Sequence, residues 1–323
     1  MSDTTVATTE ELDKYRRELT GYCYRMLGSS FEAEDAVQDT MVRAWKAIDS
    51  FEGRSSLRSW LYRIATNVCL DALSAGNRRA RPMDLSGPTP VAQAQLVKQP
   101  EITWLEPIPD GRVMPGAGDP AETAMGRETV RLAFVAALQH LAPRQRAVLI
   151  LREVLAWKAS EVAELLDTSV ASVNSALQRA RAAIAAQAPA ESDAADPLDE
   201  EQQALLERYV AAFEGYDMEA LTALLHEDAT MSMPPFDLWL QGHENIVGWM
   251  LGVGDVCRGS RLVPTVANGS PAFAHYHPDP EGGYSPWALI VLELRDGKVA
   301  GMDFFLDTPR WFPLFELPER LEA

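Results

Sequence analysis

Cysteine is scarce in this 323-residue sequence, which contains Cys23, Cys69 and Cys257, all far apart. Without a Cys-x-x-Cys spacing, a disulfide scaffold and a cysteine-built zinc site are excluded, and a reducing cytoplasm is expected. No apolar run reaches the ~18 residues of a membrane-spanning helix, so no contact with a membrane is expected. The first eleven residues are polar, and no secretory signal peptide is expected.

Basic charge is also in short supply, because 29 Lys and Arg face 47 Asp and Glu, for a net charge of -18. This charge is unevenly distributed: residues 188–323 carry -17, whereas residues 1–187 carry -1 and include local basic clusters. Each segment therefore needs its own interpretation, and the overall acidity does not exclude binding of nucleic acid by the first part of the chain.

Helical spacing of apolar residues dominates residues 12–78, with breaks at Gly28 and Gly53, and predicts a compact all-helical domain. Residues 82–127 hold eight prolines and five glycines without a sustained period, so an extended linker is expected there. An island around Trp104 within this linker is expected to pack on a neighbouring domain. Helical spacing returns in residues 128–187, and residues 188–198 form a short acidic linker.

The last part of the chain, residues 199–323, has a different pattern. Two amphipathic stretches, 200–216 and 218–226, precede alternating segments that are typical of strands, at 229–233, 236–240, 262–268, 272–277, 287–295 and 298–307. Asp296 and Gly297 between the last two segments form a strong hairpin signal. Helices followed by a meander of strands predict an α+β domain.

Residues 160–184 have the form of a helix-turn-helix. Val170 and Val173 anchor its second helix, whose other face offers groups that read base edges and phosphates in a major groove. These groups are Ser172, Asn174, Ser175, Gln178, Arg179 and Arg181. Taken alone, the same segment is also compatible with an ordinary helical hairpin.

Residues 51–81 combine arginines with aromatic side chains, a pattern that suits unstacked single-stranded bases. The cations are Arg54, Arg58, Arg63, Arg78, Arg79 and Arg81, opposed by Glu52 and Asp71. The alternative is a solvated helix face. Trp60 is expected in the core, since it shares a stripe with Leu57, Leu61 and Ile64.

Two stretches together carry a specific resemblance. Residues 33–40 followed by Ala44 and Trp45, with residues 57–67, resemble the second conserved domain of bacterial sigma factors, closest in the extracytoplasmic-function group. Residues 141–149 and the helix-turn-helix resemble that group's fourth domain. The acidic domain is similar to the SnoaL-like cone-fold domains fused to some members, and residues 104–107 look like the linker of that subgroup.

This resemblance implies a multidomain fold class: two all-α sigma domains, the second a helix-turn-helix, plus a C-terminal α+β cone-fold domain. The implied domains are sigma domain 2 at residues 12–81, which binds the polymerase core and the promoter -10 element, and sigma domain 4 at 128–187, which binds the -35 element. The linkers are expected at 82–127 and 188–198, and the SnoaL-like regulatory domain at 199–323.

The resemblance also implies roles for individual residues. Contact with the clamp helices of RNA polymerase falls on Asp35, Gln38, Asp39, Val42 and Arg43. Reading of the -10 element falls on Arg54, Ser55, Ser56, Arg58, Arg63 and Asn67. The -35 reader is the helix from Ser172 to Arg181, where Asn174 and Gln178 depart from the residues common in relatives, so its preferred sequence stays open.

The C-terminal domain has two further interpretations, because cone folds host isomerases and cyclases that use Asp, His and Tyr. Candidate catalytic groups are His226, Asp228, Asp237, His243, His275 and His277. A possible apolar pocket would be lined by Met231, Met233, Phe236, Trp239 and Trp249. No spacing of ligands indicates a metal site.

The sequence therefore predicts a sigma factor that directs the RNA polymerase core to promoters from the cytoplasm, with no cofactor, no metal and no catalysis of its own. Its acidic domain is expected to modulate activity through intramolecular contact with the sigma domains. The alternative is a cone-fold enzyme, or a ligand sensor, tethered to a DNA-binding module.

Overall fold

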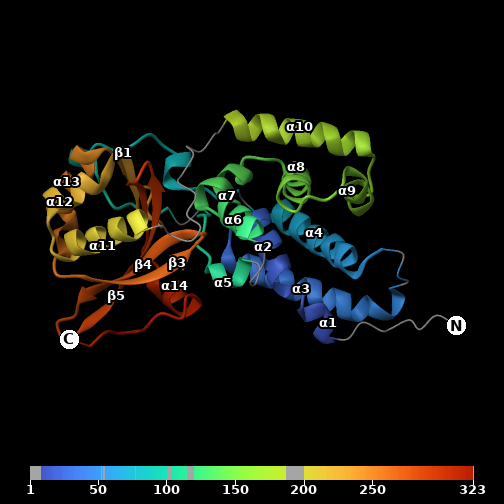
Figure 1. The fold of residues 1–323 in the computed structure, drawn as a ribbon, viewed down its shortest axis with the longest axis horizontal. Helices are drawn as coiled ribbons and strands as arrows, with labels where there is room; N and C mark the ends of the chain where they lie inside the picture. The colour runs from blue at the N-terminus through green and yellow to red at the C-terminus, as the bar shows by residue number, and fades with distance from the viewer. Residues whose placement is uncertain are drawn as a thin grey trace. The chain divides into compact units, whose positions relative to one another are not determined.

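The computed structural model describes residues 9–51, 53, 55–76, 78–99, 103–114, 120–186 and 200–322. The chain forms two compact units (Figure 1). The first unit comprises residues 1–79 and 111–189, and the second comprises residues 80–110 and 190–323. The chain thus enters the second unit twice, once in the middle and once at the C-terminal end.

The first unit begins with a helical cluster, here called domain 2. It contains α1 (Thr9–Asp13), α2 (Arg16–Leu27), α3 (Ser30–Ala47), a 3-10 turn (Ile48–Ser50) and α4 (Leu57–Ala75). Gly28 ends α2 in the left-handed conformation, with φ of 70°. Ser29 then caps α3, because its hydroxyl accepts a hydrogen bond from the Glu32 amide at 3.1 Å. Tyr22, Met26 and Leu61 are among its fully buried core residues.

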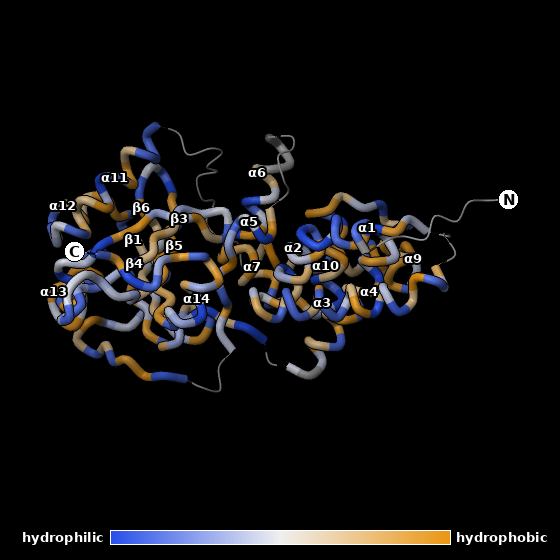
Figure 2. Tube along the Cα trace, turned by 90° about the horizontal axis from the view of Figure 1, so that it is seen from below, coloured by the Kyte–Doolittle hydropathy of each residue, from blue (hydrophilic) through white to orange (hydrophobic). Residues whose placement is uncertain are grey.

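The rest of the first unit includes the helix-turn-helix. Its elements are α5 (Asp110–Val113), α6 (Pro120–Glu128), α7 (Leu132–Gln139), α8 (Pro143–Leu149), a π-helical turn (Ile150–Val154), α9 (Ala159–Leu165) and α10 (Val170–Ala186). Helices α7 to α10 are called domain 4 below. Apolar and polar residues alternate along α3 and α4, as expected of helices with one buried face (Figure 2).

The second unit is built on a six-stranded sheet in the order β2-β1-β6-β5-β4-β3. The strands are β1 (Leu225–Ser232), β2 (Trp239–Gln241), β3 (Arg261–Ala267), β4 (Ser270–Pro278), β5 (Tyr284–Arg295) and β6 (Lys298–Phe305). Neighbouring strands are antiparallel except β1 and β6, which are parallel. The predicted hairpin at Asp296 and Gly297 is present, with both residues at positive φ and Arg295 paired with Lys298.

Helices cover this sheet and close its core. They are α11 (Glu200–Glu214), α12 (Met218–Leu224), α13 (His243–Leu251) and α14 (Thr308–Leu314), with a 3-10 turn at Val253–Cys257. Tyr209 of α11 and Ile246 of α13 belong to one apolar cluster with Phe273 and Met302 of the sheet. Aromatic residues of α14 contact other sheet side chains, since Trp311 lies 6.0 Å from Phe305 between ring centroids. The predicted α+β fold class is confirmed.

Residues 80–110 belong to the second unit, whereas the sequence predicts residues 80 and 81 in sigma domain 2 and an extended linker from residue 82. They contain 3-10 turns at Pro82–Asp84 and Val91–Gln93 and bond to strands and helices far away in sequence. The Thr89 amide donates to the Trp239 carbonyl at 2.9 Å, and the Val91 amide donates to Asn245 Oδ1 at 2.9 Å. This segment is therefore a structural part of the second unit, called the linker loop below. Within the described ranges, no helix has the length and apolarity to cross a membrane.

Candidate polymerase and promoter interface

Helix α3 carries a solvent-exposed stripe that coincides with the predicted polymerase contact. Asp35, Gln38 and Val42 are exposed at three- and four-residue spacing, as expected for one helix face. Trp45 continues the stripe and is 63% exposed. Helical period alone cannot tell a buried apolar face from an exposed one, so the exposure of Trp45 has to be read from the structure.

Charges on the same helix are paired with each other. Arg43 Nη2 lies 2.8 Å from Asp39 Oδ2, one helical turn away, and 3.9 Å separates its Nη1 from Asp71 Oδ2 on α4. All three side chains are 44% or more exposed, so the pairs contribute little to stability. The stripe thus combines apolar and mixed-charge groups at the surface, a composition suited to protein docking.

Helix α4 holds the residues predicted to read the -10 element. Ser56 caps the helix, because its hydroxyl accepts a hydrogen bond from the Ser59 amide at 3.0 Å. Arg63 and Asn67 are exposed one turn apart, whereas Ser55 is half-buried. Arg54, also predicted for this site, lies outside the described residues.

Arg58 is held by contacts within the first unit rather than directed to solvent. Its Nε donates to Glu18 Oε1 and Oε2 at 3.1 and 3.0 Å. Its guanidinium carbon lies 5.2 Å from the ring centroid of Tyr62 and 5.5 Å from that of Trp157. Burial raises the pKa of Glu18, and the charge of Arg58 opposes that shift. Arg58 therefore joins domain 2 to Trp157 of the domain 4 segment.

The arginine-rich stretch does not form one continuous surface. Arg78 bonds His140 Nε2 at 3.0 Å, and Arg79 is buried in an ion pair with Glu32 at 2.6 Å. Arg81 belongs to the linker loop, where its Nε lies 3.5 Å from Asp84 Oδ2. Trp60 is half-buried and contacts Phe51, with ring centroids 5.0 Å apart.

Helix α10 presents the residues predicted to read the -35 element on one solvent-facing side. Val173, Leu177 and Ala180 are buried and fix the helix against its neighbours. The polar side chains at the predicted positions are all exposed: Ser172, Asn174, Ser175, Gln178, Arg179 and Arg181. Two of them have local partners, because Ser172 Oγ lies 2.9 Å from Ser169 Oγ and Arg181 donates to Glu153 at 2.7 Å.

Domains 2 and 4 contact each other through arginines that bond carbonyl oxygens. Arg63 of α4 donates to the Glu164 carbonyl of α9 at 2.5 Å. Arg146 of α8 is 3% exposed, donates to the Met26 carbonyl at the end of α2, and bonds Gln139 Oε1 at 2.7 Å. Burial lowers the pKa of Arg146 to about 10, so it stays charged at neutral pH.

Most of the residues predicted to line a pocket in the second unit belong to its apolar core or pack against it. Met231, Met233 and Trp249 are buried in the apolar core, and Phe236 packs against it. Trp239 instead contacts the linker loop, since its Nε1 donates to the Ser86 carbonyl at 3.0 Å. A surface hollow of about 500 Å³ on this unit is lined by other residues, namely Met218, Glu219, Thr222, Ala223, His243, Val247 and Lys298.

The candidate catalytic groups are dispersed. His275 is fully buried beside Phe213, with ring centroids 5.2 Å apart, and neither of its nitrogens has a hydrogen-bond partner in the described part of the chain. Burial, with a smaller effect of His277, lowers the pKa of His275 to about 3. His277 itself stacks on Trp287 at 4.9 Å, after a register shift in β4. Asp237 accepts a hydrogen bond from Gln99 of the linker loop at 2.8 Å.

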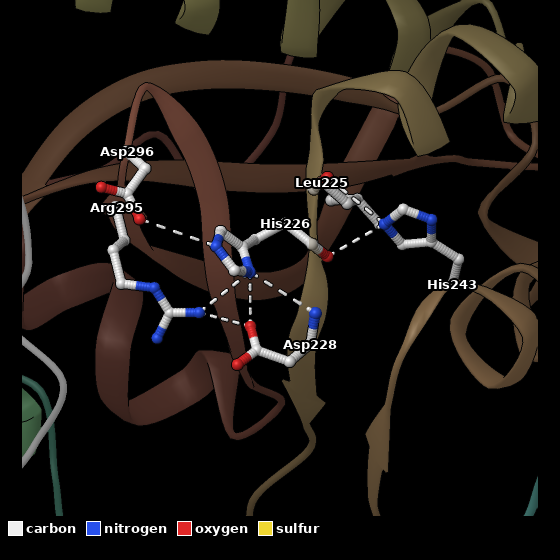
Figure 3. A network of polar contacts seen from close by, with 6 residues as sticks. All are labelled: Leu225, His226, Asp228, His243, Arg295 and Asp296. Carbon is white, nitrogen blue, oxygen red and sulfur yellow. Dashed lines mark hydrogen bonds and ion pairs between the residues drawn. The ribbon is translucent and has the colours of Figure 1, made fainter.

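The remaining candidates form a polar network between the start of β1 and the β5–β6 hairpin (Figure 3). His226 Nδ1 lies 2.5 Å from Asp228 Oδ1 and 2.9 Å from Arg295 Nη2. Burial raises the pKa of the Asp228 carboxyl, but Arg295 and His226 outweigh it and lower the pKa overall. His243 points away from this pair and bonds the His226 carbonyl at 2.9 Å. Among the described residues, no group of three or more His, Cys, Asp or Glu is arranged to hold a metal.

Three protein-family models match the chain in the order that the sequence predicted. Sigma-70 region 2 matches residues 12–79, Sigma-70 region 4 matches residues 131–184, and the SnoaL-like domain matches residues 206–302. The matched ranges correspond to domain 2, domain 4 and the sheet-containing part of the second unit.

Similar proteins cover nearly the whole chain. The ECF RNA polymerase sigma factor SigG of Mycobacterium tuberculosis is 47% identical over 316 residues, covering 96% of this chain and 83% of SigG. SigJ of the same organism is 29% identical over 306 residues, covering 90% of this chain and 89% of SigJ. The crystal structure of SigJ shares the fold, with a TM-score of 0.62 at 23% identity, over 96% of this chain and 100% of that one. The resemblance seen in the sequence is confirmed, and the chain belongs to the extracytoplasmic-function family of RNA polymerase sigma factors.

Proposed function

We propose that this protein binds the core of RNA polymerase in the cytoplasm and directs it to promoters, where domain 2 reads the -10 element and domain 4 reads the -35 element. The observation that carries the proposal is the pair of exposed faces on α3 and α10 in a chain that is 47% identical to SigG. The α3 stripe suits a protein surface, and the α10 face suits a major groove.

The free chain keeps part of its promoter-reading surface engaged within the first unit. Arg63 and Arg58, both among the residues predicted to read the -10 element, contact Glu164 and Trp157 of the domain 4 region. In the promoter complex, domains 2 and 4 would be separated from each other. Core polymerase would favour this conformation by offering each domain its own contacts, so binding would shift the population of conformations toward it. In the free chain, domain 4 itself therefore covers part of the surface that would read the -10 element.

We assign the second unit a regulatory role that acts through the linker loop. This loop connects the two sigma domains in sequence but is folded with the sheet of the second unit. Catalysis is not part of the proposal, because His275 lies in the apolar core whereas His226 and Asp228 lie at a strand end. These groups do not converge around one reacting position.

Ligand sensing by the second unit is a second candidate function, favoured by one observation. A buried imidazole without hydrogen-bond partners costs free energy, as with His275, and such groups in native proteins call for an explanation. Tyr209 contributes a further weakly satisfied group, since its hydroxyl contacts Met302 Sδ at 3.6 Å. A small neutral molecule that hydrogen-bonds the imidazole would offset this cost.

The central experiment is transcription from a defined promoter with purified core polymerase and the full chain. Asp39→Arg should weaken core binding by several kcal/mol, because it reverses a charge at a contact that loses its water when core polymerase binds α3. Glu207→Arg makes the same charge change on exposed α11 of the other unit and should bind core as the unmodified chain does. Equal core binding by both variants, measured by pull-down with helical content checked, would reject the α3 assignment.

A further inference from the structure

The first unit contains a hollow of about 1440 Å³ beside the start of α2. All of its lining residues belong to the first unit, and they come from α2, α3, α4, the stretch around α5 and α6, and residues 154–156. Among them, Gln38 and Arg58 are shared with the predicted polymerase and promoter contacts. Ligand pockets commonly measure about 300–1,000 Å³, so the hollow has room for a small molecule.

The charge of this hollow is opposite to that of the chain as a whole. The full sequence has 29 basic and 47 acidic residues. The acidic residues that line the hollow are Asp13, Glu18 and Glu34, and the basic ones are Lys14, Arg16, Arg17, Arg25, Arg58 and Arg112. A concave surface with an excess of basic groups attracts anions, even in a protein of negative net charge.

The acidic side chains of the hollow are already paired with arginines of the same hollow. The pairs are Asp13 with Arg16 at 2.7 Å, Glu18 with Arg58 at 3.0 Å, and Glu34 with Arg112. Three cations remain, namely Lys14, Arg17 and Arg25. None of the three has an ion-pair partner in the part of the chain that the structure describes.

Arg25 is the buried member of this set, with 5% of its surface exposed. Its guanidinium donates to the Gly21 carbonyl at 2.8 Å, the Thr129 carbonyl at 3.0 Å, Thr129 Oγ1 at 2.7 Å and the Gly126 carbonyl at 3.3 Å. Burial lowers the pKa of Arg25 to about 10, so it stays charged at neutral pH. A buried charge is normally compensated by an opposite one, and neutral carbonyls do not supply it.

The three unpaired cations lie along one side of α2. Lys14, Arg17 and Gly21 follow each other at three- and four-residue spacing, which places them on one helix face. A Cβ added at Gly21 would lie 3.0 Å from Arg25 Nη1, so the guanidinium occupies the place of a side chain at residue 21. The Arg25 charge thus lies about one helical turn, ~6 Å along the axis, beyond Arg17. This spacing suits a ligand with two adjacent anionic groups.

The rest of the wall includes aromatic and apolar side chains. Tyr15, between Lys14 and Arg17 in sequence, is half-buried and lines the hollow. Met125 of α6 lines it as well and is 53% exposed. Aromatic groups next to cations are typical of sites that bind nucleotides, because the ring stacks on the base while the cations bind the phosphates.

We propose that this hollow binds a small molecule that carries a diphosphate group, which Lys14, Arg17 and Arg25 contact. The proposal goes beyond promoter recognition and does not rest on it. A nucleoside diphosphate and free pyrophosphate share this group, and only the nucleotide gains from Tyr15.

Calorimetric titration of the full chain, in buffer without divalent cations and at constant ionic strength, tests the site. The probes are ADP, pyrophosphate, adenosine and succinate. ADP that binds at least about tenfold more tightly than pyrophosphate would identify the ligand as a nucleotide, whereas equal affinities would identify the diphosphate group alone. Failure of both diphosphates to bind below about 1 mM, or equally tight binding of succinate, would overturn the proposal.

Charge reversal locates the binding on the hollow. Lys14→Glu combined with Arg17→Glu should weaken binding of the tighter probe at least about tenfold, because two charge-assisted contacts become repulsive. Both side chains are exposed, so the variant should keep the helical content of the unmodified chain.

The matched control is Arg144→Glu combined with Lys158→Glu, which makes the same charge changes at exposed positions of the first unit outside the hollow. It should bind the probe within about twofold of the unmodified chain. An equal loss in the two double variants would mean that net charge alone attracts the anion, and the site would be rejected.

Hydrogen exchange on the unmodified chain gives an independent location of the ligand. Saturating ADP or pyrophosphate, whichever binds more tightly, should slow exchange over residues 13–20 and 125–129. Protection confined to other segments would place the ligand elsewhere and overturn the assignment to this hollow.

Discussion

The contacts inside the first unit differ in kind from those inside the second. In the first unit, guanidinium groups bond carbonyl oxygens between domains 2 and 4, as Arg146 does on Met26 and Arg63 on Glu164 at 2.5 Å. In the second unit, sheet and helices share one apolar cluster that includes Phe213, Phe273 and Ile290. Hydrogen bonds can be replaced by equivalent bonds to a new partner, whereas apolar burial is lost on separation. The first unit is therefore suited to separation of its two domains, whereas the second unit is suited to staying folded as one body.

The two parts of the chain also differ in net charge. Residues 1–187 carry -1, and residues 188–323 carry -17. DNA binding releases counterions from phosphates neutralised by Lys and Arg, so a strongly acidic domain gains nothing from the DNA backbone. The difference in charge favours the first unit for the promoter contact that we propose.

The largest expected effect comes from breaking the polar contact in the first unit. Arg146→Ala should lower the free energy of unfolding by roughly 2–4 kcal/mol, because buried carbonyl oxygens of Gln139, Leu141 and Met26 lose their donor. In thermal unfolding followed by circular dichroism, the transition of the first unit should fall by several degrees.

Arg144→Ala is the matched control for this variant, since Arg144 is exposed on the same helix. It should change the unfolding free energy by less than about 0.5 kcal/mol. If both substitutions were equally mild, the buried guanidinium would not be what joins the two domains, and the contrast between the units would lose its main support.

Sequence patterns predicted the elements better than the way they are joined. The alternation of apolar and polar residues, together with turn-forming residues, was enough to predict the strands of the second unit and the turn at Asp296 and Gly297. The linker loop could not be predicted, because its partners are single polar groups on remote strands and helices, such as the Trp239 carbonyl and Asn245 Oδ1. Such partners leave no period in a stretch rich in proline and glycine. Asn268 is an example. Its residue type indicates a turn, but not that its side-chain Oδ1 accepts a hydrogen bond from the Ile108 amide.

The candidate site shows the same limit. The exposed face of α10 was predictable, because a helix-turn-helix fixes which side must be buried, but its role in reading DNA stays a prediction. The exposure of Trp45 and the contact of Arg63 with Glu164 depend on which helix faces are covered by other parts of the chain. Such coverage is set by tertiary packing rather than by local spacing.

The second-largest expected effect is a pH dependence of stability caused by His275 in the interior of the second unit. The pKa of His275 is lowered to about 3 when folded, against about 6.5 for an exposed imidazole. Between these values the unfolded chain binds the extra proton, so stability rises with pH there and is lost as pH falls from 6.5 toward 3. This loss approaches about 1.4 kcal/mol per pH unit at its steepest.

His275→Leu should remove this acid sensitivity and stabilise the second unit by about 1 kcal/mol at pH 7, because two unpaired nitrogens leave the core. Denaturant unfolding at pH 7, 6 and 5 measures both effects, and His243→Gln, at a histidine outside the core, should keep the pH dependence of the unmodified chain. Destabilisation by His275→Leu at pH 7 would instead indicate that the imidazole has a partner in solution, as the ligand-sensing function requires.

The smallest expected effect tests how firmly the linker loop is attached to the persistent unit. A Cβ added at Gly248 of α13 would lie 3.2 Å from Val91 Cγ1 and 3.5 Å from its Cγ2. Val91 must then yield by a few tenths of an ångström, which weakens the bond from its amide to Asn245. Alanine also favours the helix by about 1 kcal/mol over glycine, so Gly248→Ala should leave overall stability nearly unchanged. Hydrogen exchange over residues 86–94 should nevertheless become several-fold faster.

Gly87→Ala makes the same chemical change in the loop, where nothing lies within 4 Å, and should leave exchange as it is. Unchanged exchange in Gly248→Ala would mean that α13 does not hold the loop, and attachment would then depend on the contacts at Trp239 and Asn268.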